Sequence, residues 1–236
     1  MSNLQEEMMA RKDEAQARHL SRFFKTGPGQ YGEGDLFLGI KVPTTREIVK
    51  QQWKSTDFDE LEECVASPYH EIRLAALLTL IQIFSHAKVD TETQKRCVDF
   101  YLSHTAHINN WDLVDLTCYE IIGTWLLDKD RTLLYELAEK GKTIWEQRIG
   151  IVSTMKFIRN GETDDTFRIA DILLHHPHDL IQKATGWLLR EAGKKDIGKL
   201  KKYLSTRYQT MPRTTLRYAI EKFPEEERKT YLNGTV

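Results

Sequence analysis

The stretch from Asn109 to Asp115 combines residue types that could carry out chemistry. Asn109 or Asn110 can cap a helix, because the side-chain oxygen accepts a free backbone N–H of the first turn. The apolar run at 116–127 continues a helical pattern, which places Trp111 and Asp115 at i and i+4 on one helix face. Two interpretations stay open here: a half-buried tryptophan with a capping aspartate, or an aromatic ring and a carboxylate that share a site.

The elements that must position this stretch are predicted to be helices. Residues 3–24 predict a charged amphipathic helix, and four glycines and one proline in residues 26–35 end it. Residues 36–42 predict an extended or irregular segment, because no second strand pattern is present to pair with it. Further helices are predicted near 44–53, 57–65, 69–86, 91–103, 110–126, 130–140, 143–159, 163–174, 178–193, 196–204, 212–222 and 224–231.

The predicted helices recur in pairs. The second helix of successive pairs begins near Trp111, Trp145, Asp179 and Pro212, at separations of 34, 34 and 33 residues. Such a period with two helices per unit indicates an all-α solenoid, of about 12–13 helices here, whose inner helices line a concave face. We therefore expect a single domain over 1–236, with an N-terminal helix and glycine-rich loop at 1–43 and helical repeats at 44–236.

Aromatic and basic residues recur on the predicted inner helices. Such interleaving suits a groove that stacks on bases and binds phosphates, whereas the plainer alternative is an ordinary helical core with solvated cations. The residues concerned are Tyr69, His70, Arg73, Trp111, Asp115, Trp145, Arg148, Lys183, Trp187, Arg190, Arg213, Arg217 and Tyr218.

Composition and charge restrict the class of protein. Apolar residues make up 40% of the chain, but no stretch approaches the roughly 20 apolar residues that span a bilayer. Cys64, Cys97 and Cys118 stand at no metal-ligand spacing and predict buried, reduced thiols in a cytoplasmic protein. The net charge of −1 hides an asymmetry, since residues 1–140 carry −7 and residues 141–222 carry +7. A basic C-terminal third suggests a surface for a polyanion, or simply a solvated helix face.

Five blocks in this order resemble the DNA alkylation repair glycosylases built from HEAT-like helical repeats (AlkD-like). The resemblance covers nearly the whole chain. The blocks are FFKTGPGQYGEGD at 23–35, WDLVD at 111–115, WEQRIG at 145–150, KATGWLLRE at 183–191 and MPRTTLRYAIEK at 211–222. The resemblance implies excision of cationic N3- and N7-alkylated purines, such as 3-methyladenine and 7-methylguanine, from duplex DNA in base excision repair. It also implies that Trp111, Asp115, Arg148 and Trp187 occupy the active-site positions of the family.

The chemistry of such a lesion can be argued from the residue types. A cationic purine leaves as a neutral base, so its excision needs no general acid. It needs a group that stabilises a sugar cation and positions a water, and one carboxylate can do both. Asp115 is the candidate for this group. We expect Asp112 instead to complement the dipole at a helix N-terminus.

Aromatic and cationic residues would complete the site. Trp111 and Trp187 would flank the lesion through cation–π contact, which a neutral base does not gain. The planar fork of Arg148 suits a phosphate. Tyr31 is a candidate to close one end of the site or to contact the DNA backbone. The other candidates for phosphate contact are Lys156, Arg159, Arg190, Lys194, Lys195, Arg213 and Arg217.

Other features predict little further chemistry. The run His175-His176-Pro177-His178 crosses a helix break without a carboxylate or cysteine in ligand spacing, so we expect no metal, and nothing calls for a cofactor. The expected partner is duplex DNA carrying alkylated purines, bound by a monomer, with no membrane. Most α-solenoids are adaptors, so the alternative is a non-catalytic helical-repeat scaffold that binds protein or nucleic acid. Release of methylated bases from methylated duplex DNA would separate the two.

Overall fold

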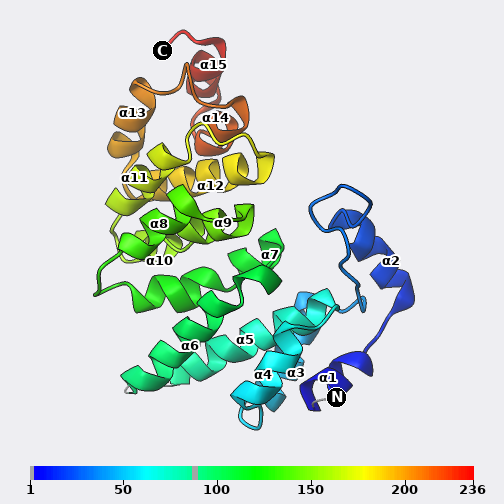
Figure 1. Cartoon of the computed structure of the whole chain (residues 1–236). Coiled ribbons are helices and arrows are strands. Elements are labelled where there is room, and N and C mark those ends of the chain that lie inside the picture. Colours follow the sequence, from blue (N-terminus) through cyan, green and yellow to red (C-terminus); the bar gives the residue numbers. More distant parts are fainter. Residues whose placement is uncertain (1–2, 87–89) are drawn as a thin grey trace. The chain divides into compact units, whose positions relative to one another are not determined.

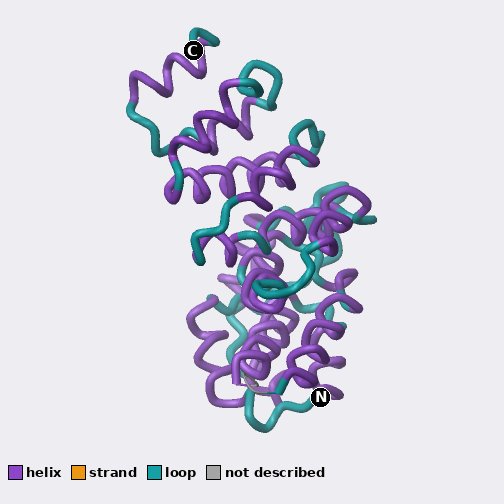
Figure 2. Tube along the Cα trace, turned by 90° about the vertical axis from the view of Figure 1, so that its left-hand side faces the viewer, coloured by secondary structure: helices purple, strands orange, loops and turns teal. Residues whose placement is uncertain are grey.

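A computed structural model describes residues 3–86 and 90–236 and divides the chain into two compact units, Met1–Leu113 and Val114–Val236. Within the described ranges the regular structure is helical, and no strand is present beyond one isolated bridge between Leu36 and Tyr69 (Figure 2). The predicted all-α class is confirmed. Single-domain organisation and a concave face stay predictions.

The first unit is built around one apolar helix, α5, which contacts α1, α3, α4 and α6 (Figure 1). The sequence of α5 is apolar on nearly all sides, so most of its residues are buried. The elements of this unit are α1 (Asn3–Met9), α2 (Glu14–Phe23), α3 (Val42–Gln52), α4 (Phe58–Val65), α5 (His70–His86), α6 (Thr91–Ser103) and the 3₁₀ turn η1 (Thr105–His107).

The segment before α3 is extended and irregular, as predicted. Leu36 pairs with the chain next to Tyr69. The buried Glu71 carboxylate then accepts the backbone N–H groups of Leu38, Gly39 and Ile40 at 2.9, 2.8 and 3.2 Å. One side chain therefore satisfies three main-chain donors that a second strand would otherwise have to pair.

The single helix predicted at 3–24 is wrong, because the chain turns between α1 and α2. The N–H of Asp13 donates to the Leu38 carbonyl at 2.8 Å, and the Asp13 side chain caps α2 by accepting from Gln16 N at 2.9 Å. Gly39, with φ +90°, lies so close to the Asp13 carbonyl that a Cβ would overlap it. Docking of this distant segment therefore breaks the helix.

The second unit contains helices packed in successive pairs (Figure 1). The boundary between the units falls inside α7 (Trp111–Asp115), so that Trp111 belongs to the first unit and Asp115 to the second. The remaining elements are the π-helical turn η2 (Tyr119–Gly123), α8 (Thr132–Lys140), α9 (Ile144–Val152), α10 (Met155–Arg159), α11 (Asp164–Ile172), α12 (Asp179–Lys195), α13 (Ile197–Ser205), α14 (Arg213–Ala219) and α15 (Glu225–Asn233).

Two predicted helices, 110–126 and 143–159, are each interrupted. The first contains a turn after α7 and then η2, while the second divides into α9 and α10. A Cβ on Gly123 would lie 2.5 Å from the Ser153 carbonyl oxygen, so the backbones of the two interrupted segments approach each other closely there. Tertiary packing thus overrides the local helical pattern at both places.

The helical repeat is confirmed by helix starts at Trp111, Ile144, Asp179 and Arg213, which are 33, 35 and 34 residues apart. Ion pairs in the second unit join residues one repeat apart, such as Arg131 with Asp165 at 2.6 Å and Asp171 with Arg207 at 2.6 Å. Successive pairs are therefore joined by charge as well as by apolar packing.

The remaining sequence expectations concern cysteines and membranes. Cys64, Cys97 and Cys118 are free and buried, as predicted. None of the helices in the described ranges combines the length and apolar character needed to cross a bilayer.

Candidate functional site

Asp115, the last residue of α7, pairs with Arg148 of α9 through a fork of two hydrogen bonds. Arg148 Nε donates to Oδ1 at 2.8 Å and Nη2 donates to Oδ2 at 2.7 Å. This parallel geometry fixes the plane of the carboxylate as well as its position. The Asp115 side chain is 15% exposed, whereas that of Arg148 is 6% exposed. The carboxylate therefore keeps a solvent-facing edge while its partner is enclosed.

Arg148 also connects α9 to α12. Its Nη1 donates to the backbone carbonyl of Leu180, near the start of α12. Trp187 lies seven residues further, about two turns or roughly 10 Å along the same helix face. Trp187 is half-buried. One guanidinium thus fixes the carboxylate of Asp115 and the helix that carries Trp187.

Trp111 lies against a cluster of aromatic rings in the first unit. It stacks on Phe24 at 5.3 Å with an interplanar angle of 22°, and Phe23 meets its edge at 6.0 Å. Phe24 in turn stacks on Phe37 at 5.2 Å. Phe24 and Phe37 are buried, whereas Trp111 is half-buried, so the indole rests on a buried aromatic support.

A buried polar cluster lies beside these rings. His70 contacts two carboxylates, with Nε2 2.8 Å from Asp112 Oδ2 and Nδ1 3.3 Å from Asp35 Oδ2. Arg73 Nη2 pairs with Asp35 Oδ2 at 2.8 Å and donates to Asn109 Oδ1 at 3.0 Å. Asn109 Nδ2 completes the cluster by donating to Asp35 Oδ1 at 3.1 Å. Every carboxylate of this cluster has a cationic partner.

Ionisation of the cluster follows from these contacts. Burial works to lower the pKa of His70, but the charge and hydrogen bond of Asp112, together with the hydrogen bond to Asp35, raise it to about 9. Burial works to raise the pKa of Asp35, yet hydrogen bonds from His70 and Asn109 and the charge of Arg73 bring it below its ordinary value. At neutral pH the cluster therefore holds two carboxylates and two cations.

The cluster revises the expectation for several residues. Asp112 lies in the first turn of α7, as expected of a dipole partner, and its buried carboxylate also pairs with His70. His70, Arg73 and Trp145 were predicted to line a groove, but all three are buried. The His70–Asp112 pair could not be predicted from the sequence, because its members are 42 residues apart and carry no spacing signal. Asn110 does cap α7, by accepting Trp111 N at 2.9 Å.

The candidate phosphate contacts divide into paired and open cations. Lys156 and Arg159 pair with Glu120 at 3.0 and 3.4 Å, and Lys194 pairs with Glu191 at 2.7 Å. Lys195, Arg213 and Arg217 are exposed, and within the described chain no carboxylate pairs with them. Tyr31 is half-buried in the glycine-rich loop.

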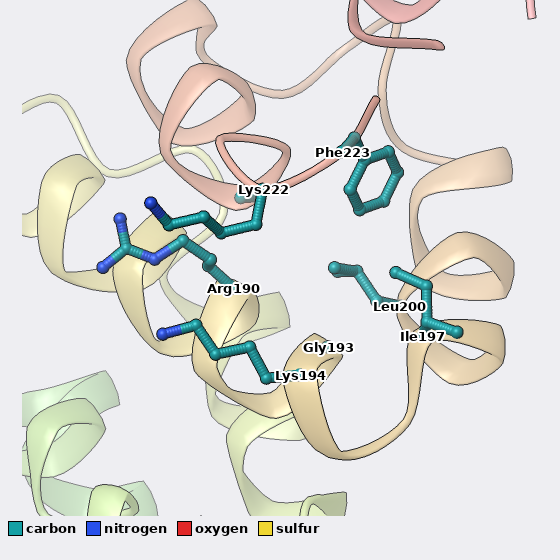
Figure 3. A pocket seen from close by; sticks show the side chains of 8 residues that line it. Arg190, Gly193, Lys194, Ile197, Leu200, Lys222 and Phe223 are labelled. Atoms are coloured by element: carbon teal, nitrogen blue, oxygen red, sulfur yellow. The ribbon is translucent and has the colours of Figure 1, made fainter. Parts of the chain in front are cut away.

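A pocket of about 170 Å³ lies between α12, α13 and α14. Figure 3 shows Arg190, Lys194 and Lys222 on one side of it and the apolar side chains of Leu200 and Phe223 on the other. Glu191 and Glu221 neutralise most of the positive charge at this rim. The pocket brings Arg190 and Lys194 together, as expected for neighbours on α12.

Across residues 3–86 and 90–236, no three His, Cys, Asp or Glu side chains converge in a way that could hold a metal ion. His176 instead contacts the Gln147 side chain at 3.0 Å.

Comparisons with known proteins identify the fold and the family of the chain. The chain resembles a solved structure described as a predicted DNA alkylation repair enzyme from Enterococcus faecalis, with a TM-score of 0.71 and 16% identity, covering 91% of this chain and 98% of that one. At this identity the likeness shows the fold. No curated protein matches the chain. A model of the family described as DNA alkylation repair enzyme matches residues 4–223. The chain therefore belongs to the DNA alkylation repair enzyme family.

Proposed function

We propose that this protein is a monofunctional DNA glycosylase that excises cationic N3- and N7-alkylated purines from duplex DNA in base excision repair. Membership of the DNA alkylation repair family supports a repair role. The observation that carries the proposal is the Asp115 carboxylate, which Arg148 holds in a fixed plane while one edge stays open to solvent. A fixed, accessible anion is what a developing sugar cation requires.

The proposed reaction has two parts. The C1′–N bond breaks, its electron pair stays with the base, and the base leaves as a neutral molecule. The sugar becomes an oxocarbenium ion, which the negative charge of Asp115 stabilises. Water then forms a bond to C1′ and gives its proton to the carboxylate, so the products are a free base and an abasic site.

Arg148 has two candidate roles. The sequence favours a phosphate contact, but the described hydrogen bonds direct Nε, Nη1 and Nη2 to Asp115 and Leu180. These contacts support a role in orienting Asp115. Trp111 and Trp187 are proposed to face the cationic lesion, where each indole would contribute about 0.5–2 kcal/mol of attraction.

The proposed substrate is bound largely through its phosphates. Lys195, Arg213 and Arg217 are exposed on α12 and α14, and they are the strongest candidates for contacts with the DNA backbone. Lys156, Arg159, Arg190 and Lys194 would exchange a carboxylate partner for a phosphate, and Tyr31 would contact the backbone from the glycine-rich loop.

The test uses four defined duplexes, carrying 3-methyladenine, 7-methylguanine, uracil or hypoxanthine. We expect release of the two cationic bases only, because a neutral base is a poorer leaving group and gains no cation–π contact. Asp115→Asn is the control for a contaminating activity. Efficient uracil release would refute selection by charge. Duplex binding without release of any base would instead support the non-catalytic scaffold.

A further inference from the structure

We propose that His70 is a positioning residue for Trp111. It fixes the backbone at Trp111 through Asp112, and it supports the indole ring through Phe24. The inference deepens the proposed function, because it rests on Trp111 facing the lesion. All of the residues that carry it belong to the first unit.

The protonation of His70 follows from its partners. Both ring nitrogens face carboxylate oxygens, Nε2 toward Asp112 at 2.8 Å and Nδ1 toward Asp35 at 3.3 Å. An ionised carboxylate only accepts hydrogen bonds, so both nitrogens must donate, and only the imidazolium form has two N–H groups. His70 therefore acts as a cationic bridge between Asp35 and α7.

The cluster holds the chain on both sides of Trp111. Asp112, the next residue, accepts from His70, while Asn109, two residues earlier, is bonded to Arg73 and Asp35. Arg73 is itself fixed by donating to the Ser67 carbonyl at 2.9 Å. The start of α7 is thereby anchored to α5 at two points.

The same histidine supports the indole through the aromatic rings. The ring of His70 lies 4.9 Å from Phe24 and stacks on Phe37 at 4.7 Å. Phe24 is the ring on which Trp111 stacks. An imidazolium stacked on the face of Phe37 adds cation–π attraction to the packing of the two rings. His70 thus contacts both the residue that follows Trp111 in the chain and the ring on which Trp111 stacks.

The position of His70 argues for this role over two others. Its side chain is 2% exposed, so it cannot touch a substrate or exchange protons with one. As a source of stability alone it would be a poor choice, because buried ion pairs are often no better than apolar residues of the same volume. A buried cation between two carboxylates does, however, define one geometry.

Loss of the proton on His70 should release this anchor. The groups that face His70 are Asp35 from the loop before α3, Asp112 from α7 and Arg73 from its own helix. Burial and Arg73 work to lower the pKa of His70, but the charge and hydrogen bond of Asp112, with the hydrogen bond to Asp35, raise it to about 9. Above this pH a neutral imidazole can donate to one carboxylate only.

The first experiment is a pH titration of the unmodified protein by NMR. The indole N–H signal of Trp111, identified by its absence in Trp111→Phe, and the ring signals of His70 are followed from pH 6 to 10. We expect both to change with one midpoint near the pKa of about 9. In Asp112→Asn both midpoints should move together to lower pH. A Trp111 signal that ignores the titration of His70 would refute the inference.

The second experiment measures excision of 7-methylguanine in single turnovers. His70→Phe keeps a ring against Phe24 and Phe37 but removes both N–H donors, and we expect a rate constant lower by roughly tenfold or more, because small misplacements of a site are costly. The affinity for undamaged duplex should stay unchanged. The matched control is His104→Phe, since His104 also stacks on a phenylalanine, Phe100, and pairs with a carboxylate, Glu62, away from Trp111.

The outcomes separate this inference from the proposed function. If the unmodified protein excises nothing, the glycosylase proposal fails, yet the NMR titration still tests the coupling of His70 to Trp111. If excision occurs and His70→Phe behaves like His104→Phe, the positioning role is refuted. If His70→Phe does not fold, the titration of the unmodified protein remains decisive.

Discussion

Asp112 and Asp115 are three residues apart on α7, yet their surroundings are opposite. Asp112 is enclosed in the first unit, where it pairs with a buried histidine that also contacts a second carboxylate. Asp115 belongs to the second unit, pairs with one arginine and keeps twice the side-chain exposure, 15% against 7%. The difference shows that the same residue type can serve structure at one position and remain accessible for chemistry at the next turn.

The partners explain how the two carboxylates differ in function. Arg148 donates to both oxygens of Asp115, and the Asp115 side chain remains 15% exposed to solvent. Asp112 divides its oxygens between His70 and the adjacent Leu113 N–H, which leaves no edge for a ligand. Accessibility of an already oriented oxygen therefore separates the candidate catalytic group from the structural one.

The largest expected effect is on the rate of excision, when the negative charge is removed at either of these two positions. Asp115→Asn should lower single-turnover excision of 7-methylguanine by roughly 10²–10⁴-fold, the usual scale for a positioned catalytic group, with DNA affinity nearly unchanged. Asp112→Asn should cost only about tenfold, through the geometry of Trp111. A larger loss from Asp112→Asn than from Asp115→Asn would reverse the assignment of the two carboxylates.

The loss in free energy of unfolding should be larger at Asp112 than at Asp115, which is the opposite of the order expected for excision. Asp112→Ala leaves a buried imidazolium short of a partner and should lower the free energy of unfolding by roughly 3–5 kcal/mol, whereas Asp115→Ala should cost less, because water reaches that site. The comparison requires urea denaturation of both variants at several pH values.

The difference in free energy of unfolding between the unmodified protein and Asp112→Ala should decrease as the pH rises. The pKa of His70 is raised on folding, so its contribution is complete below its ordinary pKa of 6.5 and is lost as pH rises through about 9. The gap between the unmodified protein and Asp112→Ala should therefore narrow from pH 7 to pH 9.5. A gap that widens over this range would contradict the assignment of His70 as the cation.

The smallest expected effect concerns the cations. Arg213→Ala and Arg217→Ala should each reduce the slope of log affinity against log salt by about 0.9, one phosphate contact, while the paired Lys194→Ala should change it less. Arg148→Ala distinguishes its two candidate roles. We expect lost excision with an unchanged slope, as befits a residue that orients Asp115. A slope lower by about one would establish the phosphate contact instead.

Local patterns predicted the helices and their repeat because both depend on short-range periodicity. The starts of α9, α12 and α14 fall within one residue of the predicted ones, since Thr143 and His178 provide caps there and a proline precedes Arg213. The residue types of the Asp115–Arg148 pair were also evident, although their mutual contact was not predicted.

Contacts between distant segments could not be predicted in this way. Gly39 lies close to the break before α2, and Gly123 lies close to the interruption between α9 and α10, so each break is contacted by a segment outside the helix that it divides. Likewise, His70 and Trp145 carry the polar and aromatic character of site residues, but only the packed structure reveals that they are buried. The residue types indicated which side chains could take part in chemistry, whereas burial in the folded chain determines which of them are accessible to a substrate.

The π-helical turn η2 sets the rotational phase of the chain after α7. In an α-helix each residue advances the side-chain direction by about 100°, and a π turn accommodates one residue more than an α-helical turn. Asp115 stands before this turn and meets Arg148, while Glu120 stands within it and meets Lys156 at 3.0 Å. Deleting Tyr119, the residue of η2 between Asp115 and Glu120, would rotate Glu120 relative to Asp115 by about 100°. The Asp115–Arg148 and Glu120–Lys156 ion pairs could then no longer form together. The extra residue of the π turn therefore orients both carboxylates toward the cations of α9 and α10.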